Sequence, residues 1–60
     1  RDPDLENALN SLNQTEKTII TLRYFEDLRL EDVARIMNLN QNTVKAKLYR
    51  GLKKLRAKME

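Results

Sequence analysis

The chain has 60 residues, of which 40% are hydrophobic and 35% are charged, and its formal net charge is +3. A chain of this length forms one domain at most and buries only about 60% of the surface that it exposes when unfolded. The absence of Cys and His excludes a disulfide framework and the usual zinc-ligand sets, and it removes the commonest acid–base residue of enzymes.

The charge is distributed unevenly. Residues 1–40 contain five Lys or Arg against eight Asp or Glu, whereas residues 41–60 contain seven Lys or Arg against Glu60 alone. This uneven charge predicts that the C-terminal third binds a polyanion, and it favours nucleic acid over a membrane surface as that partner. No apolar run approaches the roughly 20 residues that span a bilayer, so we expect a soluble, cytoplasmic protein without membrane insertion. Because the sequence begins with Arg1, we also expect residues 1–60 to be a single domain cut from a longer chain.

Residues 2–12 predict a short amphipathic helix. Asp2 is placed to cap it, and Pro3 would take its first position, where a missing N–H costs nothing. The apolar residues recur at i, i+3, i+4 and i+7, which is one helical face: Leu5, Ala8, Leu9 and Leu12.

Residues 13–28 predict a second helix. Asn13 and Glu16 have the spacing of a capping box, with Asn in place of the usual Ser or Thr. The β-branched run 18–21 alone would favour a strand, but the cap before it and the lack of alternation favour a helix. Its apolar positions are Ile19, Ile20, Leu22 and Phe25.

Residues 30–37 predict a third, brief helix, and residues from Gln41 onward predict a fourth. In the third helix the apolar residues Val33, Ile36 and Met37 follow helical spacing, and two carboxylates lie in the first turn. Asn38 tolerates the left-handed conformation that ends helices, so residues 38–40 are expected to form a tight turn, with Asn40 capping the fourth helix.

The fourth helix divides into two faces when its residues are placed at about 100° intervals. The face expected to pack on the other helices carries Val44, Leu48, Leu52, Leu55 and Met59. The opposite face carries Asn42, Ala46, Arg50, Lys53 and Ala57, with Lys45 and Tyr49 at one edge and Thr43, Lys47 and Lys54 at the other. Gly51 lies inside this helix, where it marks close packing or is simply tolerated.

A short helix, a three-residue turn and a longer basic helix together indicate a helix-turn-helix unit, whose second helix enters the major groove of DNA. The fold class is therefore all-α, a small bundle of four helices with a long basic recognition helix at its C-terminus. Ala34 is expected where the two helices cross, although an ordinary helical Ala is the alternative. The small core between the helices would be formed by Val33, Met37, Leu39, Val44 and Leu48.

The outer face of the last helix suits groove reading, because small and polar side chains lie at its centre and cations lie at its margins. Arg50 is the strongest candidate, since a guanidinium can bind guanine O6 and N7 together. Each residue also has a simpler interpretation. Basic residues near the C-terminus can be merely solvated, Tyr49 can lean on the core edge, and Gln41 and Asn42 can act as helix caps.

The sequence also resembles a known family. The stretch RYFEDLRLEDVARIMNLNQNTVKAKLYRGLKKLR is similar to region 4 of bacterial sigma factors, most closely the extracytoplasmic-function group, from about Leu9 to Met59. LEDVARIM corresponds to the family's Glu-Glu-Ile-Ala stretch, and NTVKAKLYRGLKKLR corresponds to its Thr-Val-Lys stretch with a basic tail. The resemblance implies recognition of the minus-35 promoter element by the last helix, with no cofactor and no catalysis.

The resemblance implies three partners for a monomeric domain: double-stranded promoter DNA, the β-subunit flap of the RNA polymerase core, and an anti-sigma factor that masks the domain. The implied DNA-facing positions include Lys45, Ala46, Tyr49 and Arg50. Together with the two faces described above, the candidate DNA-binding residues are Gln41, Asn42, Thr43, Lys45, Ala46, Lys47, Tyr49, Arg50, Lys53 and Lys54.

Departures from the family pattern affect the detail of this prediction. Asn42 and Asn38 replace family glycines, which Asn can do, whereas Arg29 replaces the Ser or Thr that caps the third helix and cannot cap it through an oxygen. Ala46 and Lys47 stand where Ser and Arg are common, so the hydrogen bonds of those family residues are not carried over and the base preference stays open.

Two alternatives remain open. One is the output domain of a two-component or quorum-type transcriptional regulator, which also carries Thr-Val-Lys and would dimerise through its final helix. The other is a protein-interaction module whose basic face is only solvated. An enzyme is disfavoured because the carboxylates at the start of the third helix are explained by capping and the helix dipole, and no nucleophile–base pair can be assembled.

Overall fold

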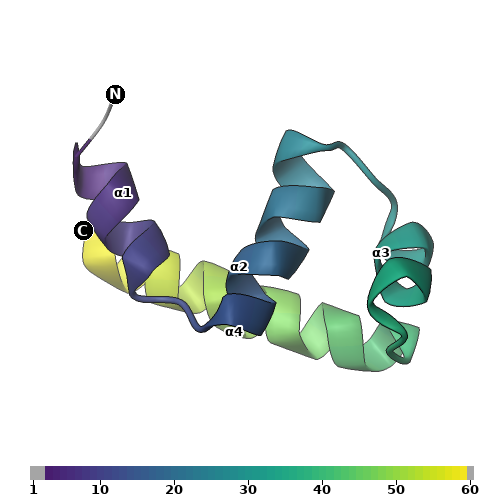
Figure 1. Ribbon diagram of the computed structural model, residues 1–60. Helices are drawn as coiled ribbons and strands as arrows, with labels where there is room; N and C mark the ends of the chain where they lie inside the picture. The colour runs from purple at the N-terminus through teal and green to yellow at the C-terminus, as the bar shows by residue number, and fades with distance from the viewer. Residues whose placement is uncertain (1–2, 60) are drawn as a thin grey trace.

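The computed structural model describes residues 3–59 and confirms the all-α prediction (Figure 1). The helices α1, α2, α3 and α4 are joined by short turns, and α2 runs directly into a π-helical segment, η1. The described residues include no strand. The bounds are α1 Pro3–Asn10, α2 Gln14–Ile20, η1 Thr21–Phe25, α3 Leu30–Met37 and α4 Gln41–Met59.

The long helix α4 is the element on which the others pack. In Figure 1, α1, α2 and α3 lie along its length, with α1 beside its yellow C-terminal part and α3 beside its N-terminal part. The first turns of α4 are therefore supported by α3 and the rest by α2 and α1. None of the helices in residues 3–59 is long and apolar enough to cross a membrane.

The predicted helix caps are confirmed for α2 and α4. The Asn13 side chain accepts a hydrogen bond from the Glu16 N–H at 2.8 Å, and the Glu16 carboxylate accepts one from the Asn13 N–H at 3.0 Å, which completes a capping box. Asn40 Oδ1 accepts a hydrogen bond from the Asn42 N–H at 2.7 Å. Arg29, as expected, makes no side-chain cap at the start of α3. The predicted cap Asp2 lies outside the described residues.

The turn between α3 and α4 also forms as predicted. Asn38 ends α3 in the left-handed conformation, with φ of 55° and ψ of 47°. Its N–H bonds back to the Arg35 carbonyl at 3.2 Å, and the Leu39 N–H bonds to the Ala34 carbonyl at 2.9 Å. These bonds satisfy carbonyl groups that a helix end otherwise leaves without partners. The turn therefore fixes the direction in which α4 leaves α3.

The core is small and lies where α2, α3 and α4 meet. Ala34 is buried, as expected for the helix crossing, while Met37 and Leu39 are half-buried against the core. Leu52 and Leu55 continue the packing face of α4. The buried residues of this hydrophobic core are Leu12, Ile19, Ile20, Val33, Ala34, Val44 and Leu48.

Four apolar residues do not take the buried places that their spacing suggests: Phe25 is 64% exposed, Ile36 59%, Met59 49% and Leu5 38%. The face of α3 that packs is centred on Val33 and Ala34, and this leaves Ile36 at its outer edge. Leu55 is the last residue of α4 among those packed against the core, so the turn that carries Met59 extends past it.

The exposure of Phe25 follows from the π-helical segment that sequence reasoning did not predict. The predicted second helix is α-helical only to Ile20, after which the Glu26 N–H bonds to the Thr21 carbonyl, five residues back, at 3.0 Å. A π turn carries one residue more than an α turn and changes the direction of the side chains that follow. Asp27 then adopts a left-handed φ of 57° and ends the segment.

Candidate nucleic-acid interface

The outer face of α4 is free to meet a partner. All five residues predicted at its centre are exposed: Asn42, Ala46, Arg50, Lys53 and Ala57. The opposite side of the same helix buries Val44 and Leu48. Because the core holds one side of α4, the other side projects as a ridge of small, polar and basic side chains.

The two margins of this face differ. On one edge, Lys45 is exposed and Tyr49 is 58% exposed. On the other edge, Thr43 and Lys47 are half-buried. Gln41, at the N-terminal end of α4, is exposed.

Most cations of the face have no anionic partner within the described part of the chain. The ion pairs formed by residues 3–59 use Arg29, Arg35 and Lys54. Lys45, Lys47, Arg50 and Lys53 take part in none of them. The charge of Arg50 also lowers the pKa of Glu16, without an ion pair between them. The four cations can therefore meet phosphate groups, which supply much of the affinity for nucleic acid.

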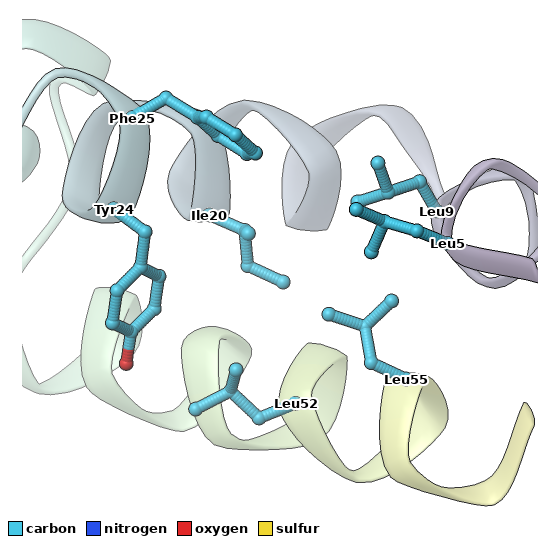
Figure 2. A pocket seen from close by; sticks show the side chains of 7 residues that line it. All are labelled: Leu5, Leu9, Ile20, Tyr24, Phe25, Leu52 and Leu55. Carbon is cyan, nitrogen blue, oxygen red and sulfur yellow. The ribbon is translucent and has the colours of Figure 1, made fainter. Parts of the chain in front are cut away.

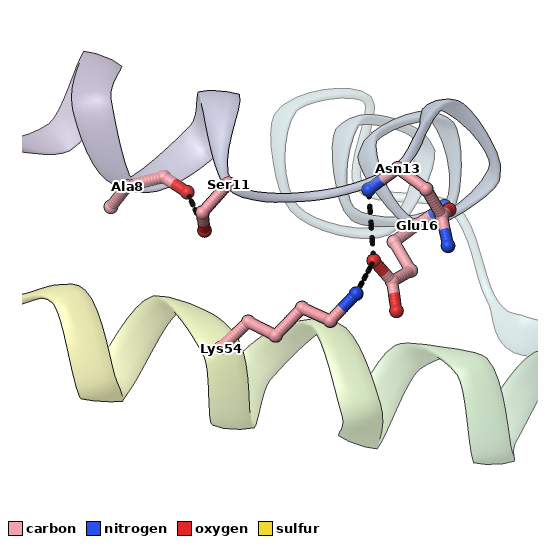
Figure 3. Close-up of polar contacts among 5 residues, drawn as sticks. All are labelled: Ala8, Ser11, Asn13, Glu16 and Lys54. Atoms are coloured by element: carbon pink, nitrogen blue, oxygen red, sulfur yellow. Dashed lines mark hydrogen bonds and ion pairs between the residues drawn. The ribbon is translucent and has the colours of Figure 1, made fainter.

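Lys54 is the exception among the predicted DNA-binding residues. Its Nζ donates a hydrogen bond to Glu16 Oε1 at 2.8 Å, and the Glu16 side chain is only 1% exposed (Figure 3). The capping box predicted an engaged Glu16, but no local pattern points to a partner 38 residues away. The structure thus places the ammonium group of the half-exposed Lys54 at the contact between α2 and α4.

The surroundings of Glu16 keep it charged. Burial by itself raises the pKa of Glu16, but the hydrogen bonds from Lys54 and from the Asn13 N–H, with the charges of Lys54 and Arg50, hold the pKa below its ordinary value. Both bonds go to Oε1, and Oε2 is buried with no hydrogen-bond partner among the described residues. In Figure 3 the Ser11 hydroxyl, which donates to the Ala8 carbonyl, marks the end of α1 just before this site.

Gly51 lies beside the same contact and does mark close packing. A Cβ added to Gly51 would lie 2.9 Å from Ile20 Cδ1 and 3.5 Å from Glu16 Cβ. The missing side chain therefore lets α4 approach α2 more closely than an Ala at this position would without a shift of Ile20.

A second surface, which we term the apolar groove, lies between α1, the end of α2 with η1, and α4. It encloses about 240 Å³, and Figure 2 shows aliphatic side chains of α1 and α4 facing the aromatic side chains of η1 across it. Tyr24 and Phe25 are both more than half exposed at its rim. The groove is lined by Leu5, Leu9, Ile20, Tyr24, Phe25, Leu52 and Leu55.

The apolar groove is separate from the outer face of α4. Leu52 and Leu55 project from the side of α4 opposite to Ala46 and Arg50, and they lie further toward its C-terminus. Large exposed apolar surfaces of this kind are typical of protein interaction sites. Residues 3–59 contain no group of acidic, His or Cys side chains that could hold a metal ion.

The sequence of the chain matches a known protein family. The family model described as Sigma-70, region 4 matches residues 3–55. The chain belongs to this family. Its described helices, with the turn 38–40 before a long basic helix, are those that the resemblance implied.

Several individual sigma factors are similar to the chain. It is 52% identical over 59 residues to the RNA polymerase sigma factor SigV of Bacillus subtilis (strain 168). This aligned stretch covers 98% of the chain and 36% of SigV. It is 30% identical over 56 residues to the RNA polymerase sigma-E factor of Streptomyces antibioticus, covering 93% of the chain and 31% of that protein. It is 29% identical over 55 residues to the ECF RNA polymerase sigma factor SigW of Bacillus subtilis (strain 168), covering 92% and 29%.

The chain thus spans about a third of the length of these relatives. No solved structure gave a significant match. The alternative of a two-component or quorum-type output domain is not favoured, because the family model and these relatives are all of sigma factors.

Proposed function

We propose that the chain is the promoter-binding domain of a sigma factor and that it recognises the minus-35 element by inserting α4 into the major groove. The observation that carries this proposal is the outer face of α4, where exposed cations without partners in residues 3–59 surround Ala46. Membership of the region 4 family supports the same conclusion. The domain acts by binding as a monomer and not by catalysis.

Within this proposal, the centre of the face reads bases. Ala46 is small enough to let α4 approach the base edges, and the exposed guanidinium of Arg50 can bind a guanine through two hydrogen bonds. Gln41, Asn42 and Thr43 lie at the helix N-terminus, where side chains of recognition helices reach base edges or phosphates.

The margins of the face bind the DNA backbone. Lys45 and Lys47 lie in the early turns of α4, and Lys53 lies further along the same exposed surface. The Tyr49 hydroxyl can donate a hydrogen bond to a phosphate oxygen. Lys54, although it belongs to the predicted set, is not assigned a phosphate contact because Glu16 already binds its ammonium group.

We also propose that the apolar groove is the contact for the β-subunit flap of RNA polymerase, as the family resemblance implies. A flap segment that presents apolar side chains would be complementary to a groove with a wholly apolar lining and an aromatic rim. The groove and the outer face of α4 are on different sides of the domain, so polymerase and DNA can bind together. An anti-sigma factor would inhibit the domain by covering either surface.

Selection of bound duplexes from a random pool tests the DNA-binding proposal. The protein carrying this chain, combined with core polymerase, is expected to enrich one short motif that resembles a minus-35 element. The same protein with Arg50→Ala is expected to lose enrichment at one or two positions of that motif. Recovery of unrelated sequences by the unaltered protein would reject sequence-specific recognition by this domain.

A further inference from the structure

The ion pair between Glu16 and Lys54 links the start of α2 to the recognition helix. Glu16 is the buried charged residue of the described chain, and its Oε1 accepts from the Asn13 N–H at 3.0 Å and from Lys54 Nζ at 2.8 Å (Figure 3). The capping box holds the carboxylate on the α2 side. The acceptor is therefore held in place by contacts within α2, independently of α4.

A buried carboxylate is costly unless a cation or hydrogen-bond donors reach it. In this fold Lys54 supplies the ammonium group. Rotating α4 by one residue turns its side chains by about 100°. In one sense this would bring Leu55 to Glu16 and leave the carboxylate without its cation; in the other it would bring Lys53 there but turn the buried Val44 and Leu48 out of the core. The ion pair and the buried side of α4 together therefore favour one rotation of the helix about its own axis.

Gly51 adds a second restraint at the same place. It lies three residues before Lys54, on the same side of the helix, and its missing Cβ allows the close approach of α4 to Ile20 and Glu16. The short distance between the helices brings the Lys54 ammonium within reach of the buried carboxylate. Gly51 and Lys54 therefore set the distance between α2 and α4 and the rotation of α4 at the same place.

The residues proposed to read DNA depend on that rotation. Arg50 lies one turn before Lys54 and Ala46 one turn before Arg50, so the three follow one side of α4. A change in rotation at Lys54 changes where Arg50 and Ala46 point when α4 lies in a groove.

We propose that Glu16 and Lys54 are positioning residues for DNA recognition: their buried ion pair orients the reading face of α4, and Lys54 does not contact phosphate. This inference rests on the DNA-binding function proposed above. It assigns a role in promoter discrimination to Glu16, which is buried on another helix and cannot itself reach DNA.

Two substitutions separate positioning from phosphate contact. Glu16→Gln removes the charge but keeps a residue that can complete the capping box, and Lys54→Met removes the ammonium group from a half-exposed side chain. Their charge-matched controls are Glu26→Gln and Lys58→Met, which alter exposed side chains. Lys54→Arg retains the cation and serves as the conservative variant.

The measurement is the affinity of the full-length protein, as holoenzyme, for the selected duplex and for a scrambled duplex over a range of salt concentrations. Circular dichroism of the purified variants sets a temperature at which all of them are folded. Glu16→Gln and Lys54→Met are each expected to lower the ratio of the two affinities by about tenfold, comparable to one lost base contact. The double variant should lose no more than either single variant, and Lys54→Arg should keep the ratio.

The salt dependence gives the second readout. With Lys54→Met the slope of log affinity against log salt should equal that of the unaltered protein, whereas loss of a phosphate contact lowers it by about 1. An unchanged affinity ratio in Glu16→Gln, relative to Glu26→Gln, would overturn the inference, as would a lowered slope in Lys54→Met. If the unaltered protein shows no preference for the selected duplex, the proposed function itself fails, which is a different result.

Discussion

Arg50 and Lys54 lie one turn apart on α4, yet their charges have different surroundings: Lys54 forms an ion pair with the buried Glu16, whereas Arg50 is exposed and forms no ion pair within residues 3–59. Residues four apart share one side of a helix. Helical spacing places Arg50 at the centre of the outer face and Lys54 at its edge, but it does not predict that Lys54 is paired. Only the position of α2 distinguishes a side chain that is free to read DNA from one that is already bound.

The exposed position of Arg50 predicts a loss of discrimination when it is removed. Arg50→Ala should weaken binding to the selected duplex by about 1–3 kcal/mol and binding to scrambled DNA much less. Lys45→Ala should weaken both alike and lower the salt slope by about 1, because it removes a phosphate contact. Fluorescence anisotropy with both duplexes checks this. Equal losses on the two duplexes for Arg50→Ala would contradict its assignment as a base-reading residue.

The apolar groove predicts a defect in polymerase binding that leaves DNA recognition intact. Phe25→Ser removes an exposed aromatic from the rim of the groove and should weaken binding to core polymerase by about 2 kcal/mol, the size of an aromatic hot-spot contact. Ile36→Ser is the matched control, since Ile36 is similarly exposed but lies outside the groove. Competition between variants for core polymerase provides the measurement. A larger loss with Ile36→Ser would place the contact on α3 instead.

The cap of the recognition helix predicts a specific stability change. Asn40→Ala removes the side-chain acceptor of the Asn42 N–H and should lower the free energy of unfolding by about 1 kcal/mol. Asn42→Ala is the control, because the Asn42 side chain is exposed and no hydrogen bond from it is observed within the described chain. Urea unfolding followed by circular dichroism measures both. Equal changes would mean that the Asn40 side chain does not stabilise α4.

The capping and turn residues show how much of this fold could be predicted from sequence. The capping and turn roles of Asn13, Glu16, Asn38 and Asn40 depend on neighbours within a few residues, and local spacing therefore identified these four residues. The exposed and buried faces of α4 up to Leu55 were predicted for the same reason.

The features that escaped prediction depend on residues distant in sequence or on backbone detail. The partner of Lys54 comes from 38 residues away, and helical spacing cannot reveal which side of α4 meets an acidic group. A π-helical segment of five residues such as η1 is too short to show a recognisable spacing of apolar residues, so the exposure of Phe25 was not predicted. Ile36 follows apolar spacing, but only the arrangement of α3 against α4 shows which edge of that face remains outside.

The close approach at Gly51 predicts that two substitutions are coupled. Gly51→Ala favours the helix by about 1 kcal/mol through backbone propensity, but its Cβ would meet Ile20 Cδ1 at 2.9 Å. Ile20→Val removes that atom, so Gly51→Ala should stabilise the Ile20→Val variant by about 1 kcal/mol and the unaltered protein by less, or not at all. A double-mutant cycle of unfolding free energies tests the coupling. Strict additivity would show that Ile20 does not limit the approach of the helices.

The lowered pKa of Glu16 predicts how stability depends on pH. The unfolded chain binds a proton at Glu16 nearer its ordinary pKa of 4.5, whereas the folded chain binds it only at lower pH. The stabilisation is therefore complete above the ordinary pKa and is lost as the pH falls through the folded value. Unfolding free energies from pH 7 to pH 3, about the span over which carboxyl groups titrate, should fall more steeply for the unaltered protein than for Glu16→Gln.

The exposed residue Glu31 provides the control for this titration. Glu31 forms only a long contact of 3.9 Å with Arg29, so Glu31→Gln should retain the steep acid dependence. If the profile of Glu16→Gln is parallel to that of the unaltered protein, the ion pair with Lys54 does not contribute to stability in this range.

The division of α4 into two sides also bears on how such a domain can diversify. Ala46 and Arg50 are exposed, and substitutions at exposed sites away from caps and ion pairs usually change stability by less than about 0.5 kcal/mol. The opposite side, from Val44 to Leu55, holds the core together and tolerates little change. A duplicated copy of this domain can therefore acquire a new promoter preference through a few surface replacements while its folding requirements stay the same.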